Sequence, residues 1–489
     1  MFTSTIAAIL IHALIPQGAT PPAAEGVLAA LNKPAKSVQD KAKSWRPVFD
    51  AWLALGQPPR EFGPNFNVGN IWPGMEGWEQ VAAWAQSGAP LSQALVQTQN
   101  ALAFGLPYGK SAVSDEYQKR GIYGDVGEGD SLGAHEFPYL NAVRGIAAFA
   151  TAEMYRLAEA GKFDEAAGVA VANLRFLRRI CDQQMAEEQL VAIELLIDSL
   201  RANRDMIWTY REKIPAETLK LLAKSEYPFL QATDNERLRR MQLPEGERVL
   251  LEAVLERTFG EDGQARDGVF EEFFGRWQSR GDALGSFGAA RMWGALAPVH
   301  GSLDASRKRL TNIYDDWWRR WRMNPNGPVA KLKTEFAATN STRYAAILLM
   351  LQDLQRLFDM RDILIAEANG TAVAAGLAGH AREYGDVWPR DKDEVYATFV
   401  IKRVDFDPYQ KAYPYTRGDE GRFIYRKLAD RFAVETPLGR VWATNAILYA
   451  RGKDHEDNDA RAASFDAATG DLVIWPPIRA LAREEGLVE

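Results

Sequence analysis

The sequence predicts a mainly α-helical protein, a helical-hairpin body, with a small C-terminal α+β domain. Through most of the chain apolar residues recur at helical spacing, whereas after Tyr384 they fall in short β-branched and aromatic runs separated by turn residues. The chain has 489 residues, too many for one ordinary core. We therefore expect a helical body over residues 25–335, followed by a long helix and a small strand-rich head over residues 341–489.

The N-terminus is expected to be a signal peptide or an apolar segment over residues 1–22. Residues 6–15 are apolar apart from His12, a run too short to span a bilayer, and Pro, Gly and small residues follow as they do before a cleavage site. No basic residue precedes the run, since the first lysine is Lys33, so a buried N-terminal helix is the alternative. The pattern favours export to the periplasm or cell envelope, and no transmembrane anchor is expected in the mature chain.

Composition narrows the function classes. The net charge is −7, from 58 basic and 65 acidic residues, which argues against a general nucleic-acid binder because such proteins need a basic surface. Cys181 is the single cysteine, which excludes an intramolecular disulfide and a cysteine-based zinc cluster.

The clearest part of the body is a predicted helical hairpin at residues 139–184. Apolar residues recur every three or four positions on both sides of Gly161, which is expected to break the helix, and Asp164 is a candidate N-cap for the second helix. Further helices are expected over residues 187–211, 216–223, 245–258 and 303–322. In the last of these, the "DDWWRRWR" segment could suggest a membrane or nucleic-acid surface. Leu310, Tyr314, Trp317 and Trp321 share one helical face, however, so a core role is favoured.

The head is predicted to start with a long amphipathic helix, because Ile347, Met350, Leu351, Leu354 and Phe358 form one stripe. Four strand-like runs follow. They cover residues 395–404, 421–428, 440–450 and 471–477.

The order of these turns and strands resembles the C-terminal head of the major pseudopilins of type II secretion. The matching residues are Gly385, Pro389, Asp407, Pro408, Tyr409, Pro414, Tyr415, Tyr449, Gly452, Asp454 and the stretch 471–475. They cover about residues 341–479, less than a third of the chain. Variants of this head also follow helical regions in exported bacterial proteins of unknown function. The resemblance implies the fold but not the pilus role, because residues 341–349 are too short and polar to be a pilin's hydrophobic helix. An apparent insertion at residues 429–446 is a second departure.

The loop "ARGKDHEDND" is the candidate metal site. Asp454, Glu456, Asp457, Asn458 and Asp459 offer side-chain oxygens, the ligands that calcium prefers, and the resemblance implies calcium in this loop. The EF-hand pattern does not fit, and a solvated charged loop is the alternative.

Two function hypotheses remain open. Ser131 lies in Gly-Asp-Ser-Leu-Gly, but no buried strand precedes it and no histidine is marked as its base, so a glycine-rich loop is favoured. The first hypothesis is an exported non-enzymatic scaffold or binding protein of the cell envelope, with protein partners that the sequence does not identify. The second is a hydrolase of carbohydrate or ester substrates, which predicts a deep cleft lined by Trp72, Trp78 or Trp293 with two facing carboxylates.

Overall fold

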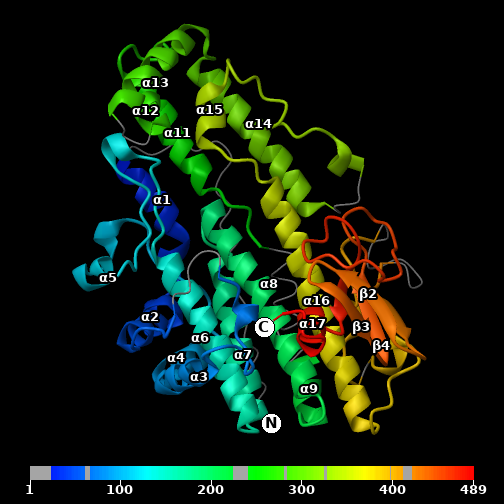
Figure 1. The fold of residues 1–489 in the computed structure, drawn as a ribbon. Helices are drawn as coiled ribbons and strands as arrows, with labels where there is room; N and C mark the ends of the chain where they lie inside the picture. Colours follow the sequence, from blue (N-terminus) through cyan, green and yellow to red (C-terminus); the bar gives the residue numbers. More distant parts are fainter. Residues whose placement is uncertain are drawn as a thin grey trace, which may run out of the picture.

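A computed structural model describes residues 24–60, 66–223, 241–279, 283–323, 328–396, 398–410 and 421–488. Over these ranges the chain is mainly helical, and five short strands lie near the C-terminus (Figure 1). This confirms the predicted class, a mainly α protein with a small strand-rich C-terminal part. The predicted signal segment at residues 1–22 lies outside the described residues, as do Pro414 and Tyr415.

The first half of the body surrounds one antiparallel helical hairpin. The elements are α1 (Ala24–Lys36), α2 (Trp45–Ala54), α3 (Trp78–Ser87), α4 (Ala89–Thr98), α5 (Asp115–Lys119), α6 (Tyr139–Glu159), α7 (Phe163–Ile180), α8 (Ala186–Thr209) and α9 (Ala216–Ala223). The predicted α6–α7 hairpin is present, and Gly161 turns the chain with a φ of 73°. Asp164 is not the N-cap, because the cap position belongs to Lys162. Asp164 instead accepts a hydrogen bond from Thr218 Oγ1 at 2.6 Å, which joins α7 to α9.

The second half of the body forms the upper part of Figure 1. It contains α11 (Gly246–Thr258), α12 (Val269–Gln278), α13 (Ala283–Leu296), α14 (Leu303–Arg322) and α15 (Ala345–Met350). The predicted helices at 216–223 and 303–322 have the expected bounds, and those at 187–211 and 245–258 differ by one or two residues. On α14, Leu310, Tyr314, Trp317 and Trp321 are all buried, as the core interpretation predicted.

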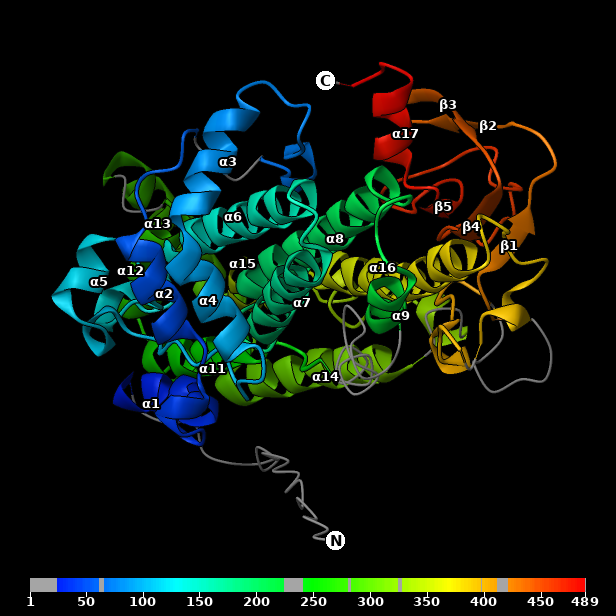
Figure 2. The ribbon, with the colours of Figure 1, turned by 90° about the horizontal axis from the view of Figure 1, so that it is seen from below.

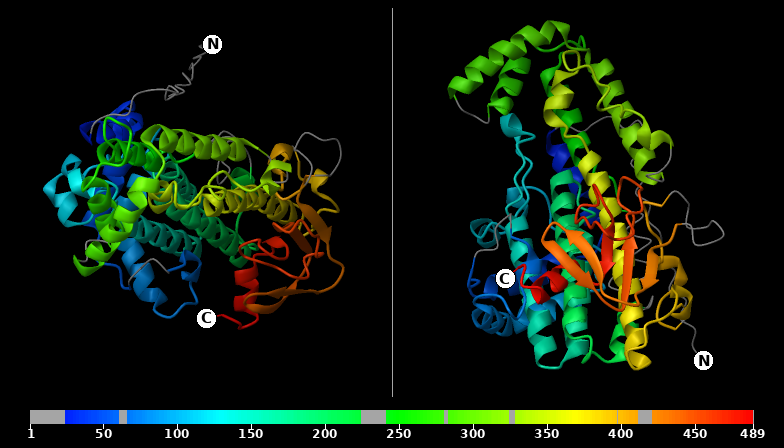
Figure 3. Two further views of the ribbon diagram at one scale, coloured as in Figure 1. Left: turned by 90° about the horizontal axis from the view of Figure 1, so that it is seen from above. Right: turned by 45° about the vertical axis from the view of Figure 1, so that its right-hand side comes forward.

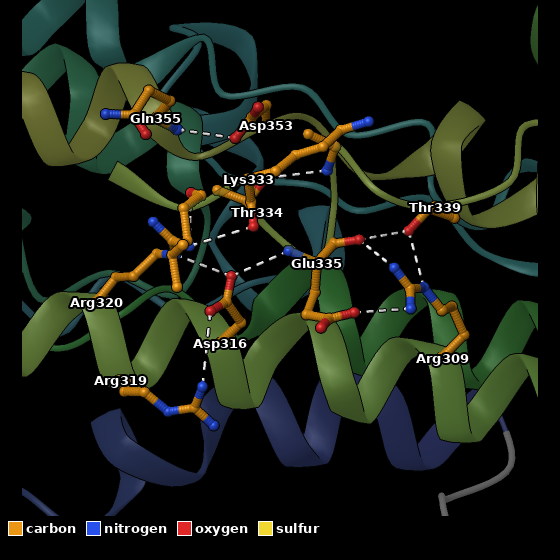
Figure 4. A network of polar contacts seen from close by, with 12 residues as sticks. Arg309, Asp316, Arg319, Arg320, Lys333, Thr334, Glu335, Thr339, Asp353 and Gln355 are labelled. Atoms are coloured by element: carbon orange, nitrogen blue, oxygen red, sulfur yellow. Dashed lines mark hydrogen bonds and ion pairs between the residues drawn. The ribbon is translucent and has the colours of Figure 1, made fainter. Parts of the chain in front are cut away.

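A polar network fastens α14 to the chain that leads into the head (Figure 4). The buried Asp316 carboxylate accepts hydrogen bonds from Arg320 Nε at 2.9 Å and from the Glu335 backbone N–H at 3.1 Å. Arg309, two turns earlier on α14, reaches the same segment, where it pairs with the Glu335 side chain at 2.8 Å and donates to Thr339 Oγ1 at 2.9 Å. These contacts hold residues 332–339 along the helix although the segment itself is irregular.

The long helix begins later than predicted. The expected stripe from Ile347 is interrupted, because α15 ends at Met350 and the next helix, α16, runs over Gln355–Glu383. Nearly all of α16 beyond Ile363 is buried, since α8, α9 and the sheet surround it. Small residues allow this close packing. A Cβ at Gly370 would lie 2.8 Å from Ile474, and one at Gly376 would lie 2.0 Å from Val400.

The head contains two antiparallel sheets. The strands are β1 (Ile424–Lys427), β2 (Phe432–Thr436), β3 (Gly439–Ala443), β4 (Ala446–Ala450) and β5 (Leu472–Trp475). Three of them form a sheet in the order β1-β4-β5, with Tyr449 opposite both Ile424 and Val473, and β2 pairs with β3. The sheet lies against α16 (Figure 3), and β4 is buried along its whole length. The last helix is α17 (Ile478–Glu484).

Two strand predictions need correction, and the apparent insertion has a structural role. Residues 395–404 do not form a strand: Phe399 and Val400 instead pack against the small residues of α16 within an irregular turn. The run 440–450 is two strands, because the chain reverses at Asn445, whose φ is 67°. The apparent insertion at residues 429–446 is itself structural, since it supplies the hairpin of β2 and β3.

A buried ion-pair cluster joins the head to the body. Glu367 on α16 is 1% exposed at its side chain and pairs with Arg201 at 2.7 Å and with Arg204 at 2.5 Å, both on α8. On α17, Arg483 pairs with the buried Asp205 of α8 at 3.4 Å. Helices far apart in sequence are thereby held together by charge as well as by apolar packing.

Among the described residues, no helix is both long enough and apolar enough to cross a bilayer.

Candidate functional site

The acidic loop connects β4 to β5, and local hydrogen bonds define its shape. Asp454 accepts the Glu456 backbone N–H through Oδ1 at 3.1 Å and the Gly470 N–H through Oδ2 at 3.2 Å. Asp457 Oδ1 accepts the Tyr449 hydroxyl and the Asp459 N–H, both at 3.0 Å. Asp and Asn favour such turns because their short side chains reach the backbone two residues further on. The loop carboxylates thus organise their own backbone.

Asp471 is a residue that the site prediction missed. It ends the loop just before β5, it is 0% exposed, and its Oδ2 accepts the backbone N–H groups of Ala460 at 2.7 Å and Asn458 at 3.1 Å. Its Oδ1 is buried and accepts no hydrogen bond from the described residues. A buried acceptor without a partner is costly, so this oxygen is a position where a donor or a cation would be favourable.

The electrostatics of Asp471 point the same way. Burial, with a smaller contribution from the negative charges of Asp457 and Asp454, raises the pKa of this carboxyl to about 6, although the two backbone N–H groups that it accepts lower it. A cation beside Asp471 would stabilise its charged form and reverse this pKa shift. One feature of the sequence could have indicated Asp471, because it is an acidic residue directly before an apolar strand. That feature does not show that the side chain is buried.

Backbone carbonyls of the same loop lie close to Gly452. Gly452 lies so close to the far side of the loop that an added Cβ would be 2.2 Å from Gly470 O, 3.0 Å from Ala467 O and 3.3 Å from Asp454 Oδ1. Only glycine fits at this position. Carboxylate and carbonyl oxygens are the ligand types of a calcium loop.

The other predicted ligands are spread over the surface of the loop. Glu456 is exposed, and Asn458 is bound to Asp471 through its backbone N–H. Asp459 pairs with Arg426 at 3.3 Å, and Asp457 lies 3.6 Å from Arg451. Across the described ranges, no three His, Cys, Asp or Glu side chains converge in a metal-binding arrangement. Calcium binding by Asp454, Glu456, Asp457, Asn458 and Asp459 therefore stays a prediction, and it requires side chains of the loop to turn inward.

The loop is attached to the helical body through Arg201. While its Nε pairs with Glu367, its Nη2 donates to Phe465 O at 2.5 Å, and its guanidinium lies 5.5 Å from the centre of the Phe465 ring. Lys453 makes a second connection, to Asp359 of α16 at 2.6 Å. The loop is therefore in direct contact with α8 and α16, and a change in its conformation would affect both helices.

Ser131, the candidate nucleophile, lies in a short 3-10 turn over Gly129–Ser131. Its hydroxyl donates to Glu128 O at 2.8 Å and accepts the Glu128 N–H at 3.1 Å. Three histidines elsewhere in the chain that could in principle act as its base have other contacts: His300 contacts Gly301 O, His380 contacts Val387 O and His455 contacts Tyr409 O. The hydroxyl thus closes a turn, in agreement with the loop interpretation.

The tryptophans expected in a hydrolase cleft each have a partner within the protein. Trp293 is 2% exposed and stacks on Phe274 with a ring-centre distance of 4.9 Å. The Trp78 indole N–H donates to Glu159 at 2.9 Å. The guanidinium of Arg483 lies 4.9 Å from the centre of the Trp72 ring. These contacts give all three tryptophans a packing role.

Comparisons with protein-family models, with curated proteins and with solved structures found no match to this chain.

Proposed function

We propose that this chain is an exported, non-enzymatic scaffold or binding protein of the cell envelope, and that its C-terminal head holds a calcium ion in the loop between β4 and β5. The observation that carries the calcium proposal is the buried Oδ1 of Asp471, which no described residue pairs with. It lies in a loop rich in carboxylate and carbonyl oxygens. The ion would supply positive charge to these oxygens and hold the two ends of the loop together.

The resemblance to pseudopilin heads is part of the same proposal. A long helix followed by an antiparallel sheet, an acidic loop and a last buried strand is the order that the resemblance implies, and α16, β1, β4 and β5 occur in that order. The scaffold role is supported by the way the head is joined to the body, because Arg201 links the loop to α8 and α16. Calcium would stiffen this junction and stabilise a surface for protein partners.

Calcium binding is tested by thermal unfolding of the full chain in calcium and in chelator. A ligand that binds the native state at 100 times its Kd stabilises it by about 2.7 kcal/mol, so the midpoint should rise with calcium. Asp471→Asn should reduce or remove this rise, because the substitution takes one negative charge from the site and calcium affinity depends on the charge of the ligands. Asp430→Asn is the matched control, an exposed aspartate at the turn before β2, and it should keep the full response. Equal midpoints with calcium and chelator would refute the calcium site.

Export is tested separately. If the chain is expressed with its own N-terminus in a Gram-negative host, we expect it in the periplasmic fraction with a new N-terminus near residues 19–24, after the apolar run. A cytoplasmic chain that retains Met1 would contradict the envelope role and leave the calcium result unaffected.

A further inference from the structure

A second candidate site lies on the helical body, away from the head. The end of α1, the turn over Asp40–Ala42 and the segment after Gly105 enclose a pocket of about 330 Å³. This volume is within the range of small-molecule sites. In Figures 1 and 2, α1 and the sheet of the head lie on opposite sides of the body, so the pocket is separate from the acidic loop.

The pocket is basic in an acidic protein. Lys36, Lys43 and Arg46 line it, against the single carboxylate of Asp40. Asp40 is already bound to Lys43 at 2.7 Å, whereas neither Lys36 nor Arg46 forms an ion pair with a described residue. Residues 33–46 contain five basic residues and one acidic residue, although the whole chain has a net charge of −7. An anion is the ligand that would neutralise this concentration of positive charge.

The walls of the pocket are held in place without a ligand. The Asn32 side chain accepts the Tyr108 backbone N–H at 2.8 Å and donates to Tyr108 O at 2.9 Å. The Trp45 N–H donates to Phe104 O at 3.1 Å, which holds the start of α2 against the opposite wall. A site whose walls are fixed before binding loses less entropy when a ligand enters.

Gly105 places Lys43 at this site. Its φ is +82°, and an added Cβ would lie 2.6 Å from Cδ of Lys43, so glycine leaves room for the lysine chain to cross. Beside it, the Trp45 ring lines the pocket, with the Arg46 guanidinium 5.1 Å from its centre. Cations therefore lie next to an aromatic surface.

A smaller pocket of about 100 Å³ adjoins the basic one, because Ala35 and Gly105 line both. Leu31, Phe104 and Leu102 contribute to its wall. Leu102 is 68% exposed, a large apolar side chain left open to solvent. Arg179 and Asp182 also line the smaller pocket, so it combines apolar side chains with one charge of each sign beside the more basic pocket.

We propose that this pair of pockets binds an organic phosphate or carboxylate, with its anionic group at Lys36, Lys43 and Arg46 and a small apolar group beside Leu102. The same chemistry occurs in free organic anions and in anionic lipid headgroups.

The proposal is tested by calorimetric titration of the full chain with butyl phosphate, and with inorganic phosphate for comparison. We expect saturable binding of one butyl phosphate per chain, and tighter binding than for inorganic phosphate. Lys36→Ala with Arg46→Ala should weaken binding at least about tenfold, which corresponds to the loss of one charge-assisted hydrogen bond. Both side chains are exposed, so the fold should be retained. Lys331→Ala with Lys333→Ala removes two exposed lysines elsewhere and should bind as the unmodified chain does.

Two further arms separate the alternatives. Leu102→Ser should reduce the preference for butyl phosphate over inorganic phosphate while phosphate binding is kept. If the natural ligand is a lipid headgroup, vesicles of phosphatidylglycerol should compete with butyl phosphate, and vesicles of phosphatidylcholine should not. If the natural ligand is a free anion, neither kind of vesicle should compete. Either result agrees with the shared chemistry. The absence of saturable butyl phosphate binding, or equal binding by the Lys36/Arg46 variant, would overturn the proposal.

Discussion

Replacing Glu367 by glutamine tests whether the buried ion pairs hold the head to the body. The carboxylate pairs with Arg201 at 2.7 Å and Arg204 at 2.5 Å, and the exposed fractions of these two arginine side chains are 21% and 3%. Glutamine keeps the shape but removes the negative charge, so two guanidinium groups lose their counterion. Breaking a buried pair in this way costs about 3–5 kcal/mol, and water beside Arg201 offsets part of the loss. We expect a destabilisation of about 3 kcal/mol.

The assay is urea-induced unfolding followed by far-ultraviolet circular dichroism at pH 7. Glu194→Gln is the matched control, because its pair with Arg356 is at the surface, where the two side chains are 38% and 70% exposed, and such pairs contribute less than about 1 kcal/mol. The arginines lower the pKa of Glu367 below its usual value, despite its burial. The stability that the Glu367 ion pairs contribute is therefore present above the pKa of this carboxyl in the unfolded chain. It is lost as the pH falls through the pKa of Glu367 in the folded protein. If Glu367→Gln unfolds at the same urea concentration as Glu194→Gln, the pairs do not hold the junction.

Three other predictions concern the body. Burial raises the pKa of Glu188 to about 7, although Tyr139 and Tyr108 donate hydrogen bonds to it. The folded state therefore favours the protonated form of Glu188. The free energy of unfolding should fall by about 3 kcal/mol as the pH rises from 4.5 to above 7. Glu188→Gln should flatten the change in melting temperature over this pH range. Trp317→Ala removes an indole that is 1% exposed and should cost about 3–5 kcal/mol in chemical unfolding, far more than the same change at the partly exposed Trp318. Asp316→Asn should cost about 2 kcal/mol and speed proteolysis of the segment at residues 332–339, and an unchanged cleavage rate would contradict the network in Figure 4.

The helices that could be predicted are those with one apolar face. α14 is an example. Its helical spacing of apolar residues identified the helix, and the face that they share is the buried one: Leu310, Tyr314, Trp317 and Trp321. α16 shows the opposite case. It is buried on all sides, so its inner half is rich in alanine and glycine and has no stripe, and the stripe that was visible belongs to a broken region around Leu351.

Strands were harder to predict because their neighbours decide their role. Residues 395–404 have the composition of a strand, but they pack their apolar side chains into α16 and pair with no sheet. The residues of β2 and β3 were interpreted as an insertion, because a pairing between them depends on a turn that local composition marks only weakly.

The candidate site was predicted in part. The acidic residues at 454–459 could be identified from their oxygen content alone. Asp471 and Arg201 could not, because the importance of each comes from burial and from contacts with distant parts of the chain.

The contact between α17 and the N-terminal part of the body has a consequence for biosynthesis. Arg479 donates to Asn67 Oδ1 at 2.9 Å across 412 positions of sequence. A ribosome therefore makes almost the entire polypeptide before this contact can form, and until then Asp205 and Asn67 lack their arginine partners on α17. Until its last residues are made, the chain lacks the packing of α17 against α8 and remains open on this side. We expect truncation before Ile478 to prolong that open state and to increase the requirement for chaperones.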